Sequence, residues 1–135
     1  MGGPYKLGNE WLLEASELVE SAYYEVDLEN TKNLIDYTHR LDAPAIYMGW
    51  YSRRAYQQWQ NALLKAPVGA IAYHLHSFSA KTIRTKKKAW VAPLLEKGYA
   101  ATFGYVYEPF LNLTVRPDLF IESLLKDRSI GEAFA

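Results

Sequence analysis

Residues 69–75 read Gly-Ala-Ile-Ala-Tyr-His-Leu, an uncharged run of small, β-branched and aromatic residues. Pro67, which interrupts regular structure, lies just before this run. Such a run is typical of a strand buried on both faces of a parallel sheet. Patterns of strand length also occur at residues 24–27, 45–50 and 99–107. The sequence therefore predicts about four short strands, with residues 69–75 as the most secure.

Helical patterns separate these strands. Apolar residues recur at helical spacing over residues 10–23, and similar patterns predict helices over 28–41 after an Asp27 N-cap, 53–64, 89–97, 118–126 and 130–135. Gly98 is placed to end the fourth helix, and Pro93 fits its first turn better than its interior. Alternating strands and helices predict right-handed parallel crossovers, and so a three-layer α-β-α sandwich of Rossmann-like type.

Composition limits the fold and the partners. A chain of 135 residues, half of them hydrophobic, is expected to form a single α/β domain over residues 1–135. The formal net charge is zero, so we expect neither nucleic acid nor a membrane surface as partner, and we interpret the basic run at 84–88 as a solvated face. The chain has no cysteine. It also has no signal-peptide pattern and no apolar run near the roughly 20 residues of a membrane span, so a soluble protein of unassigned compartment is expected.

Ligands of open parallel sheets bind beyond the carboxyl ends of the strands, and this rule locates the candidate site. The strand ends here are polar and aromatic. Candidate catalytic residues are His74, His76, Ser77 and Glu108, and candidate ligand-binding residues are Trp50, Tyr51, Ser52, Phe78, Ser79 and Tyr107. We assign no metal ligands and identify no cofactor.

Several kinds of chemistry stay open at these residues. His74 and His76 lie two apart, so on a strand both rings point to one side, and Glu108 from a neighbouring strand end would complete three metal ligands. A histidine on a covered sheet face is, however, more often a hydrogen-bonded structural residue. Ser77 and Ser79 are candidate nucleophiles, but neither lies in a Gly-x-Ser-x-Gly elbow, and capping of the following turn is the simpler role.

Four motifs resemble an uncharacterised family of bacterial proteins. They are Gly8-Asn9-Glu10-Trp11, Gly49-Trp50-Tyr51, the run from Pro67 to Ala80, and Gly104-Tyr105-Val106-Tyr107-Glu108-Pro109-Phe110. The resemblance covers nearly the whole chain but implies no activity, because the family is known as one of unknown function. Its members are longer at the amino end and continue past Ala135, which implies that this chain is a carboxyl-terminal fragment with an incomplete sheet. Exposed sheet edges would then favour self-association, and longer members would be candidates for export.

A fainter resemblance is to the caspase-like fold of gingipain-type peptidases. Gly49-Trp50-Tyr51 and His76-Ser77-Phe78 would occupy its two strand ends, but there is no histidine near Gly49 and no cysteine anywhere. The resemblance thus implies a peptidase-like scaffold without that peptidase chemistry, and fold analogy alone does not assign activity.

Two functions follow as hypotheses. The first is a non-catalytic binding or scaffold domain, in which Trp50, Tyr51, Phe78 and Tyr107 line a pocket for a small molecule, peptide or glycan. The alternative is a hydrolase, metal-assisted or of degenerate peptidase type, with its site at the strand carboxyl ends. The sequence favours the first, because an incomplete sheet seldom supports catalytic geometry.

Overall fold

The computed structural model describes residues 3–31, 33, 35–39, 41, 44–61 and 63–135. It divides the chain into two compact units, one formed by residues 1–30 with 111–135 and the other by residues 31–110. The first unit contains α1 (Pro4–Ser21), η2 (Leu111–Leu113), α3 (Pro117–Leu125) and α4 (Ile130–Phe134). The second contains β1 (Ile46–Gly49), η1 (Gln57–Gln60), β2 (Ile71–His74), α2 (Val91–Glu96) and β3 (Ala101–Phe103).

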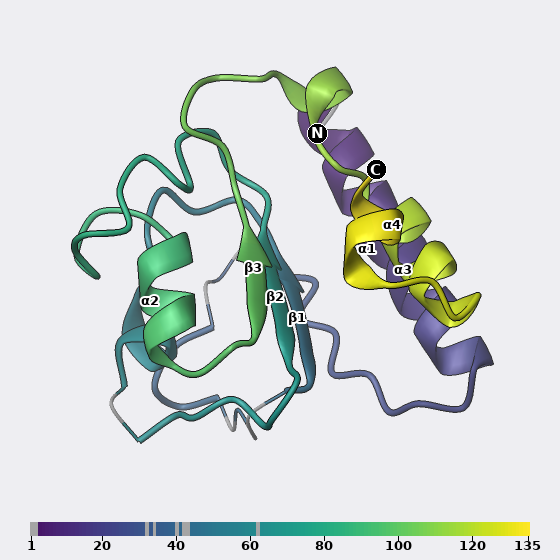
Figure 1. The fold of residues 1–135 in the computed structure, drawn as a ribbon, viewed down its shortest axis with the longest axis horizontal. Helices are drawn as coiled ribbons and strands as arrows, with labels where there is room; N and C mark the ends of the chain where they lie inside the picture. Colours follow the sequence, from purple (N-terminus) through teal and green to yellow (C-terminus); the bar gives the residue numbers. More distant parts are fainter. Residues whose placement is uncertain (1–2, 32, 34, 40, 42–43, 62) are drawn as a thin grey trace. The chain divides into compact units, whose positions relative to one another are not determined.

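The second unit is built on an open parallel sheet of three strands. Their order is β1-β2-β3, so β2 is the central strand, as Figure 1 shows. Ile46 pairs with Ile71, and Ile71 with Ala101, in a register that runs without interruption along each pair. All four residues of β2 are buried, as expected for a strand with neighbours on both sides.

One face of this sheet carries the hydrophobic core of the unit. Tyr47 and Ala72 lie opposite each other in the register. They cluster with Trp59 of η1, with Trp90 at the N-cap of α2 and with Leu94 within α2. Tyr47 and Trp59 approach to 3.9 Å between ring centroids. In Figure 1, α2 lies alongside this small sheet. The core therefore joins β1, β2, η1 and α2 into one body.

The ends of α2 agree with the sequence patterns. Pro93 is the third residue of the helix. A backbone N–H at this position has no partner within the helix, so the N–H that proline lacks costs no intrahelical hydrogen bond. Gly98 follows the C-cap residue Lys97 with φ of 93°, the left-handed conformation that glycine adopts at low cost. The predicted helix over 89–97 is confirmed, with its start two residues later.

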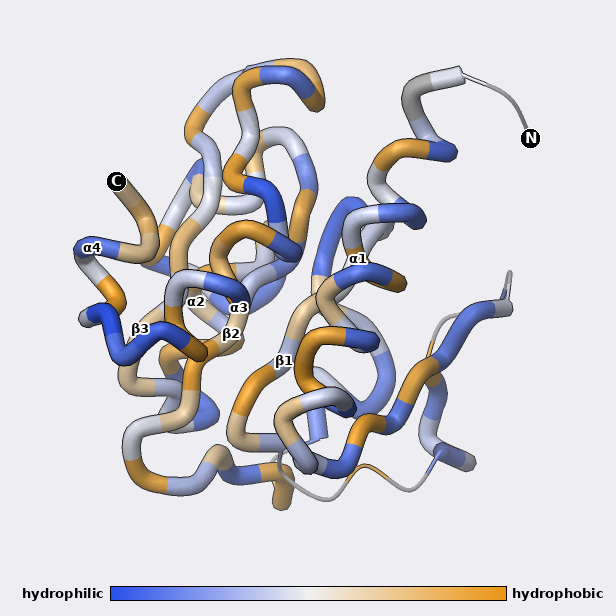
Figure 2. The backbone as a smooth tube through the Cα atoms, turned by 90° about the vertical axis from the view of Figure 1, so that its right-hand side faces the viewer, coloured by the Kyte–Doolittle hydropathy of each residue, from blue (hydrophilic) through white to orange (hydrophobic). Residues whose placement is uncertain are grey.

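The first unit is helical. Among its residues, Trp11 and Ala15 of α1 and Phe120 and Ile121 of α3 are buried, and α1 packs against α3. The guanidinium of Arg116 lies 5.2 Å from the centroid of the Trp11 ring. Figure 2 shows hydrophobic and hydrophilic residues alternating along α1, the pattern of an amphipathic helix. No helix within the described ranges is long and apolar enough to cross a membrane.

Three of the four predicted strands are present, and residues 24–27 lie in no strand or helix. Tyr23, at φ of 66°, ends α1, and the side chains of Tyr24, Glu25 and Asp27 are exposed. A strand here would need a neighbouring strand to pair with and an apolar face to bury. Val26 alone offers little apolar surface for such a face. The structure thus shows a mixed α/β fold with three parallel strands.

The predicted helix over 28–41 is also absent from its described residues, and Leu34 lies outside them. Short polar side chains compete for the backbone here. Thr31 Oγ1 accepts the N–H of Asn33 at 3.1 Å, and Asp36 Oδ1 accepts that of Thr38 at 2.7 Å. Such local bonds favour turns over helix.

The predicted helix over 53–64 is reduced to the single 3₁₀ turn of η1, with Ala62 outside the described residues. Its backbone groups bond to other parts of the unit. The N–H of Ala55 donates to the carbonyl of Ala89 at 3.4 Å, and Lys97 Nζ donates to the carbonyl of Asn61 at 2.6 Å. Tertiary contacts have replaced the helical hydrogen bonds that the periodicity predicted. Conversely, α1 begins at Pro4, before the predicted start of this helix at residue 10.

Candidate functional site

His74 is the last residue of β2, and both of its ring nitrogens are engaged within the fold. The backbone N–H of Ser52 donates to Nε2 at 3.2 Å, so Nε2 carries no proton, and Nδ1–H donates to the Tyr47 hydroxyl at 2.9 Å. The side chain is 3% exposed. Burial, with a smaller contribution from His76, holds the pKa of His74 well below its ordinary value. His74 is thus a neutral, structural imidazole.

Trp90 completes this arrangement. Its indole stacks on the His74 ring with centroids 3.5 Å apart and planes 7° apart, and its Nε1–H donates to the carbonyl of Ser52 at 2.7 Å. Ser52 is therefore held through its backbone N–H by His74 and through its carbonyl by Trp90. The turn that follows β1, with its cis peptide bond between Trp50 and Tyr51, is fixed to β2 and to the start of α2.

Gly49 makes this packing possible. A Cβ at this position would collide with the hydroxyl end of Tyr47 and would lie 3.2 Å from His74 Nδ1. The space above the glycine is occupied by the hydrogen bond between those two side chains. Glycine is required at the end of β1 because the tyrosine crosses over it.

Ser79 is fully buried and ties three segments together. Its hydroxyl oxygen accepts the backbone N–H of Tyr105 at 3.1 Å, and its carbonyl accepts the N–H groups of Trp90 and Val91, each at 3.1 Å. Gly104 leaves room for the hydroxyl, since a Cβ there would overlap it. Ser79 thus joins the loop after β2 to the end of β3 and the start of α2, and it presents no free hydroxyl to solvent.

His76 lies outside this buried set, beyond the end of β2. Its Nδ1–H donates to the carbonyl of Ser77, which leaves Nε2 as an acceptor on the neutral ring. The ring packs on Tyr51 at 4.7 Å between centroids, and Tyr51 meets Trp50 edge to face at 5.5 Å. Partial burial lowers the pKa of His76, and Arg53 adds to this, against opposing effects of the Ser77 carbonyl and Glu108. We call Trp50, Tyr51 and His76 the aromatic row.

Ser77 and Glu108 meet next to this row. The Ser77 hydroxyl donates to the carboxylate of Glu108, which belongs to the segment after β3. Glu108 is exposed. The structure therefore brings together two of the predicted catalytic residues from separate strand ends, in a contact that is exposed to solvent.

Phe78 and Tyr107 flank the Ser77–Glu108 pair through their backbones. The N–H of Phe78 donates to the carbonyl of Tyr107 at 3.2 Å, and Phe78 has a left-handed φ of 60°. Their side chains are 42% and 56% exposed. Both aromatic rings are thus available at the surface that carries Ser77 and Glu108.

The predicted site divides into an inner and an outer set. The inner residues His74, Ser52 and Ser79 are buried and hold the loops, whereas the outer residues are Trp50, Tyr51, His76, Ser77, Phe78, Tyr107 and Glu108. His74 and His76 do not present their rings to a common point, since His74 is committed to Tyr47 and Ser52. Within the described ranges, no three His, Asp or Glu side chains form a group suited to hold a metal ion.

Sequence reasoning missed the residues that support the site. Neither Tyr47 nor Trp90 is among the predicted site residues. Their roles depend on hydrogen bonds to residues that are distant in sequence, with separations of 27 positions for Tyr47 and His74 and 38 for Trp90 and Ser52. No local spacing signals such contacts. Gly104 carried a usable signal, because a glycine within a strand pattern often marks close approach of another segment.

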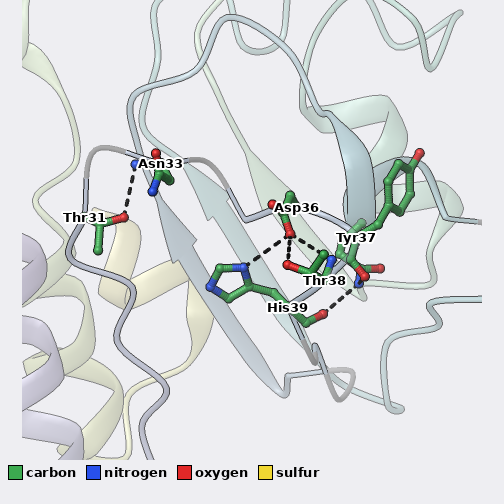
Figure 3. Close-up of polar contacts among 7 residues, drawn as sticks. Thr31, Asn33, Asp36, Tyr37, Thr38 and His39 are labelled. Atoms are coloured by element: carbon green, nitrogen blue, oxygen red, sulfur yellow. Dashed lines mark hydrogen bonds and ion pairs between the residues drawn. The ribbon is translucent and has the colours of Figure 1, made fainter.

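A second polar cluster lies in residues 31–39, away from these contacts along the chain. Figure 3 shows the Asp36 carboxylate accepting from the backbone and hydroxyl of Thr38, with His39 Nδ1 3.7 Å away. These bonds, led by the Thr38 hydroxyl, lower the pKa of Asp36. Gln58 Nε2 donates to the carbonyls of Tyr37 and His39, at 3.1 and 2.7 Å. The cluster shapes this segment and attaches it to η1.

The fold and the outer residues define a mixed α/β protein with an open parallel sheet and a polar, aromatic surface beyond its strand ends. Comparisons with protein-family models, curated proteins and solved structures give no match to this chain.

Proposed function

We propose that this chain is a non-catalytic ligand-binding domain whose recognition surface is the aromatic row together with Ser77 and Glu108. The observation that carries the proposal is the contact of the exposed Tyr51 ring with His76. Beside this contact, the Glu108 carboxylate accepts a hydrogen bond from the Ser77 hydroxyl. The row supplies apolar area, and the pair supplies hydrogen-bonding groups of defined position.

A glycan is the ligand that this surface suits best. Sugar rings offer apolar C–H faces that stack on aromatic rings, and their hydroxyl groups donate to carboxylates as the Ser77 hydroxyl does here. The neutral His76 ring adds an acceptor at Nε2. Arg53 and Glu108 bring opposite charges to the neighbourhood of His76, which favours an uncharged ligand over an ionic one. A peptide is the other ligand class that such a surface accommodates.

The proposal extends to the longer unit of the bacterial family that the motifs resemble. Both units of this chain would belong to one domain of that family, with a fourth strand and a third layer completing a Rossmann-like or caspase-like sandwich. The edge strands β1 and β3 would pair with those further strands or, in their absence, with a second copy.

The test is a screen of glycan and peptide arrays with the intact chain, followed by titration of the hits. Tyr51→Ala is expected to weaken binding at least tenfold, and Glu108→Gln several-fold. Tyr24→Ala, which removes a 65% exposed tyrosine elsewhere, is the matched control and is expected to bind as the unaltered chain does. Absence of any hit, or hits that Tyr51→Ala leaves unchanged, would overturn the proposal.

The contact between the Ser77 hydroxyl and the Glu108 carboxylate favours a hydrolase as the second candidate. His76 does not act as base for this hydroxyl in the observed geometry, because the hydroxyl donates to Glu108 and the Nδ1–H of His76 donates to the Ser77 carbonyl. Incubating each array hit with the protein distinguishes the two functions. Cleavage that Ser77→Ala abolishes would establish the hydrolase, and intact ligand would support the binding domain.

A further inference from the structure

The zero net charge of the chain conceals a strong separation of charge between its two units. Residues 31–110 contain eleven Lys and Arg against four Asp and Glu, whereas the other unit contains four against eleven. Within the basic unit, residues 81–97 hold six of the eleven cations and a single acid, Glu96. The expectation of no charge-driven partner rested on the zero net charge and on the interpretation of the basic run at 84–88 as a solvated face.

The loop that carries most of these cations is ordered by its own threonines. The N–H of Arg84 donates to Thr82 Oγ1 at 3.1 Å, and the N–H of Lys87 donates to Thr85 Oγ1 at 3.2 Å. Two successive turns therefore fix the backbone at the positions of Arg84 and Lys87. Fixing these positions before a ligand binds reduces the entropy lost on binding.

This loop and α2 border an open, shallow hollow of about 430 Å³, lined by Ile83, Arg84, Thr85, Lys86, Lys87, Ala92 and Glu96. Its volume lies in the range of roughly 300–1,000 Å³ that is usual for small-molecule sites. Its lining combines two apolar side chains and a threonine with three cations and one carboxylate. The size favours a small ligand over a macromolecule.

Glu96 neutralises only part of this charge. Lys86 Nζ lies 2.8 Å from Glu96 Oε1, and this bond, with Lys65 and Lys97 nearby, lowers the pKa of Glu96. Within the described residues, no carboxylate forms an ion pair with Arg84 or Lys87. Two cations thus face the hollow without a counter-charge.

We propose that this hollow is a second binding site, separate from the glycan surface, for a small ligand that carries two or more linked phosphate groups. The guanidinium of Arg84 offers paired donors that match phosphate oxygens, and Lys86 and Lys87 add point charges to the lining of the same hollow. A ligand with several negative charges is required, because Glu96 repels an anion and salt screens single surface charges.

The experiment is calorimetric titration of the intact chain with inorganic tripolyphosphate at 50 mM and 200 mM NaCl. We expect one site, with affinity at least fivefold weaker at the higher salt concentration. The double variant Arg84→Gln/Lys87→Gln is expected to lose at least tenfold. The control Lys6→Gln/Arg128→Gln removes the same charge from the other unit and is expected to bind as before.

Glu96→Gln provides a test of opposite sign. Removing the carboxylate from the hollow is expected to tighten tripolyphosphate binding several-fold, whereas a mere loss of structure would weaken it. Adenosine triphosphate and inorganic phosphate form two further arms: binding of the nucleotide alone would still support a phosphate site and assign its source. The proposal would be overturned if neither polyphosphate probe bound at 50 mM NaCl, or if the control and loop variants lost equal affinity. Weaker binding by Glu96→Gln would also overturn it.

Discussion

The backbone N–H of Ser52 donates to Nε2 of His74 across 3.2 Å. The side chain of His74, at the end of the central strand β2, therefore holds the turn that follows the neighbouring strand β1. The bond requires an unprotonated Nε2. The stability of the turn therefore depends on the charge of one buried imidazole.

The first prediction concerns pH. The pKa of His74 is depressed in the folded protein, while an unfolded histidine titrates near pH 6.5. Below that pH the unfolded chain binds more protons, so the free energy of unfolding falls as pH drops from 7 to 5, by at most about 1.4 kcal/mol per pH unit for one such group. His76, whose pKa is also lowered, acts in the same direction. Carboxylates with lowered pKa, such as that of Glu96, lose their contribution only below about pH 4.5.

Urea unfolding at pH 7, 6 and 5 measures this effect. His74→Gln, which keeps an acceptor for the Ser52 N–H, is expected to be less stable at pH 7 but to show a shallower pH dependence. A wild-type stability that stays constant or rises between pH 7 and 5 would contradict the assignment.

The second prediction concerns Trp90. Trp90→Phe retains an aromatic ring against His74 but loses the Nε1–H bond to the Ser52 carbonyl. The buried carbonyl is left without this donor, and with the reduced packing we expect a loss of about 2–4 kcal/mol. Chemical denaturation gives the value, and Trp11→Phe in the other unit serves as a comparison for the loss of one tryptophan. Faster amide exchange at Ser52 in Trp90→Phe would identify the turn as the segment released; unchanged exchange there would argue against this link.

The third prediction concerns Gly104 and Ser79. A Cβ at Gly104 would lie 3.0 Å from Val91 Cγ2 and 3.1 Å from the backbone nitrogen of Ala80, and it would overlap the Ser79 hydroxyl. Gly104→Ala is expected to cost about 1–3 kcal/mol through overpacking. Ser79→Ala alone should cost about 1–3 kcal/mol, because the Tyr105 N–H loses its acceptor.

The two substitutions are expected to be coupled. Removing the hydroxyl frees part of the space that the new methyl group needs, so the double variant should be less destabilised than the sum of the single variants. A double-mutant cycle from urea midpoints measures the difference. Strict additivity would show that the hydroxyl is not the obstacle.

The fourth prediction concerns α4. Ser129 and Glu132 form a reciprocal capping box, in which each side chain bonds the backbone N–H of the other. Ser129→Ala removes one of these bonds and is expected to cost the helix about 1 kcal/mol. Amide exchange at residues 132–134 should accelerate several-fold while β2 is unaffected; equal acceleration in β2 would indicate global destabilisation instead.

The strands and α2 were predictable from sequence because each carries its own signal. Ile71 to His74 is apolar enough for a central strand, and Pro93 and Gly98 mark the two ends of α2. The helix expected over 53–64 was wrong because Asn61 and Ala55 use their backbone groups in contacts with distant residues, which periodicity does not encode. Propensity was overruled by tertiary structure.

The meeting of two candidate residues at neighbouring strand ends was predictable from sequence, but the division of roles among the candidate residues was not. The rule that strand ends carry ligands pointed to both Ser77 and Glu108, and these two meet. The spacing of His74 and His76 does not reveal that the two histidines have different roles. The difference arises because Tyr47, Ser52 and Trp90 surround His74, whereas Tyr51 packs beside His76. Burial, which the linear pattern does not reveal, separates a structural histidine from a surface one.

The helical unit is discontinuous in sequence, since residues 1–30 and 111–135 form it around the sheet unit between them. During synthesis, α1 leaves the ribosome before the sheet unit, and its packing partner α3 follows only after the sheet unit has been made. At roughly 5–20 residues per second, the apolar stripe of α1 stays uncovered for several seconds while residues 31–110 are translated. The sheet unit is thus able to fold before α1 can pack against α3.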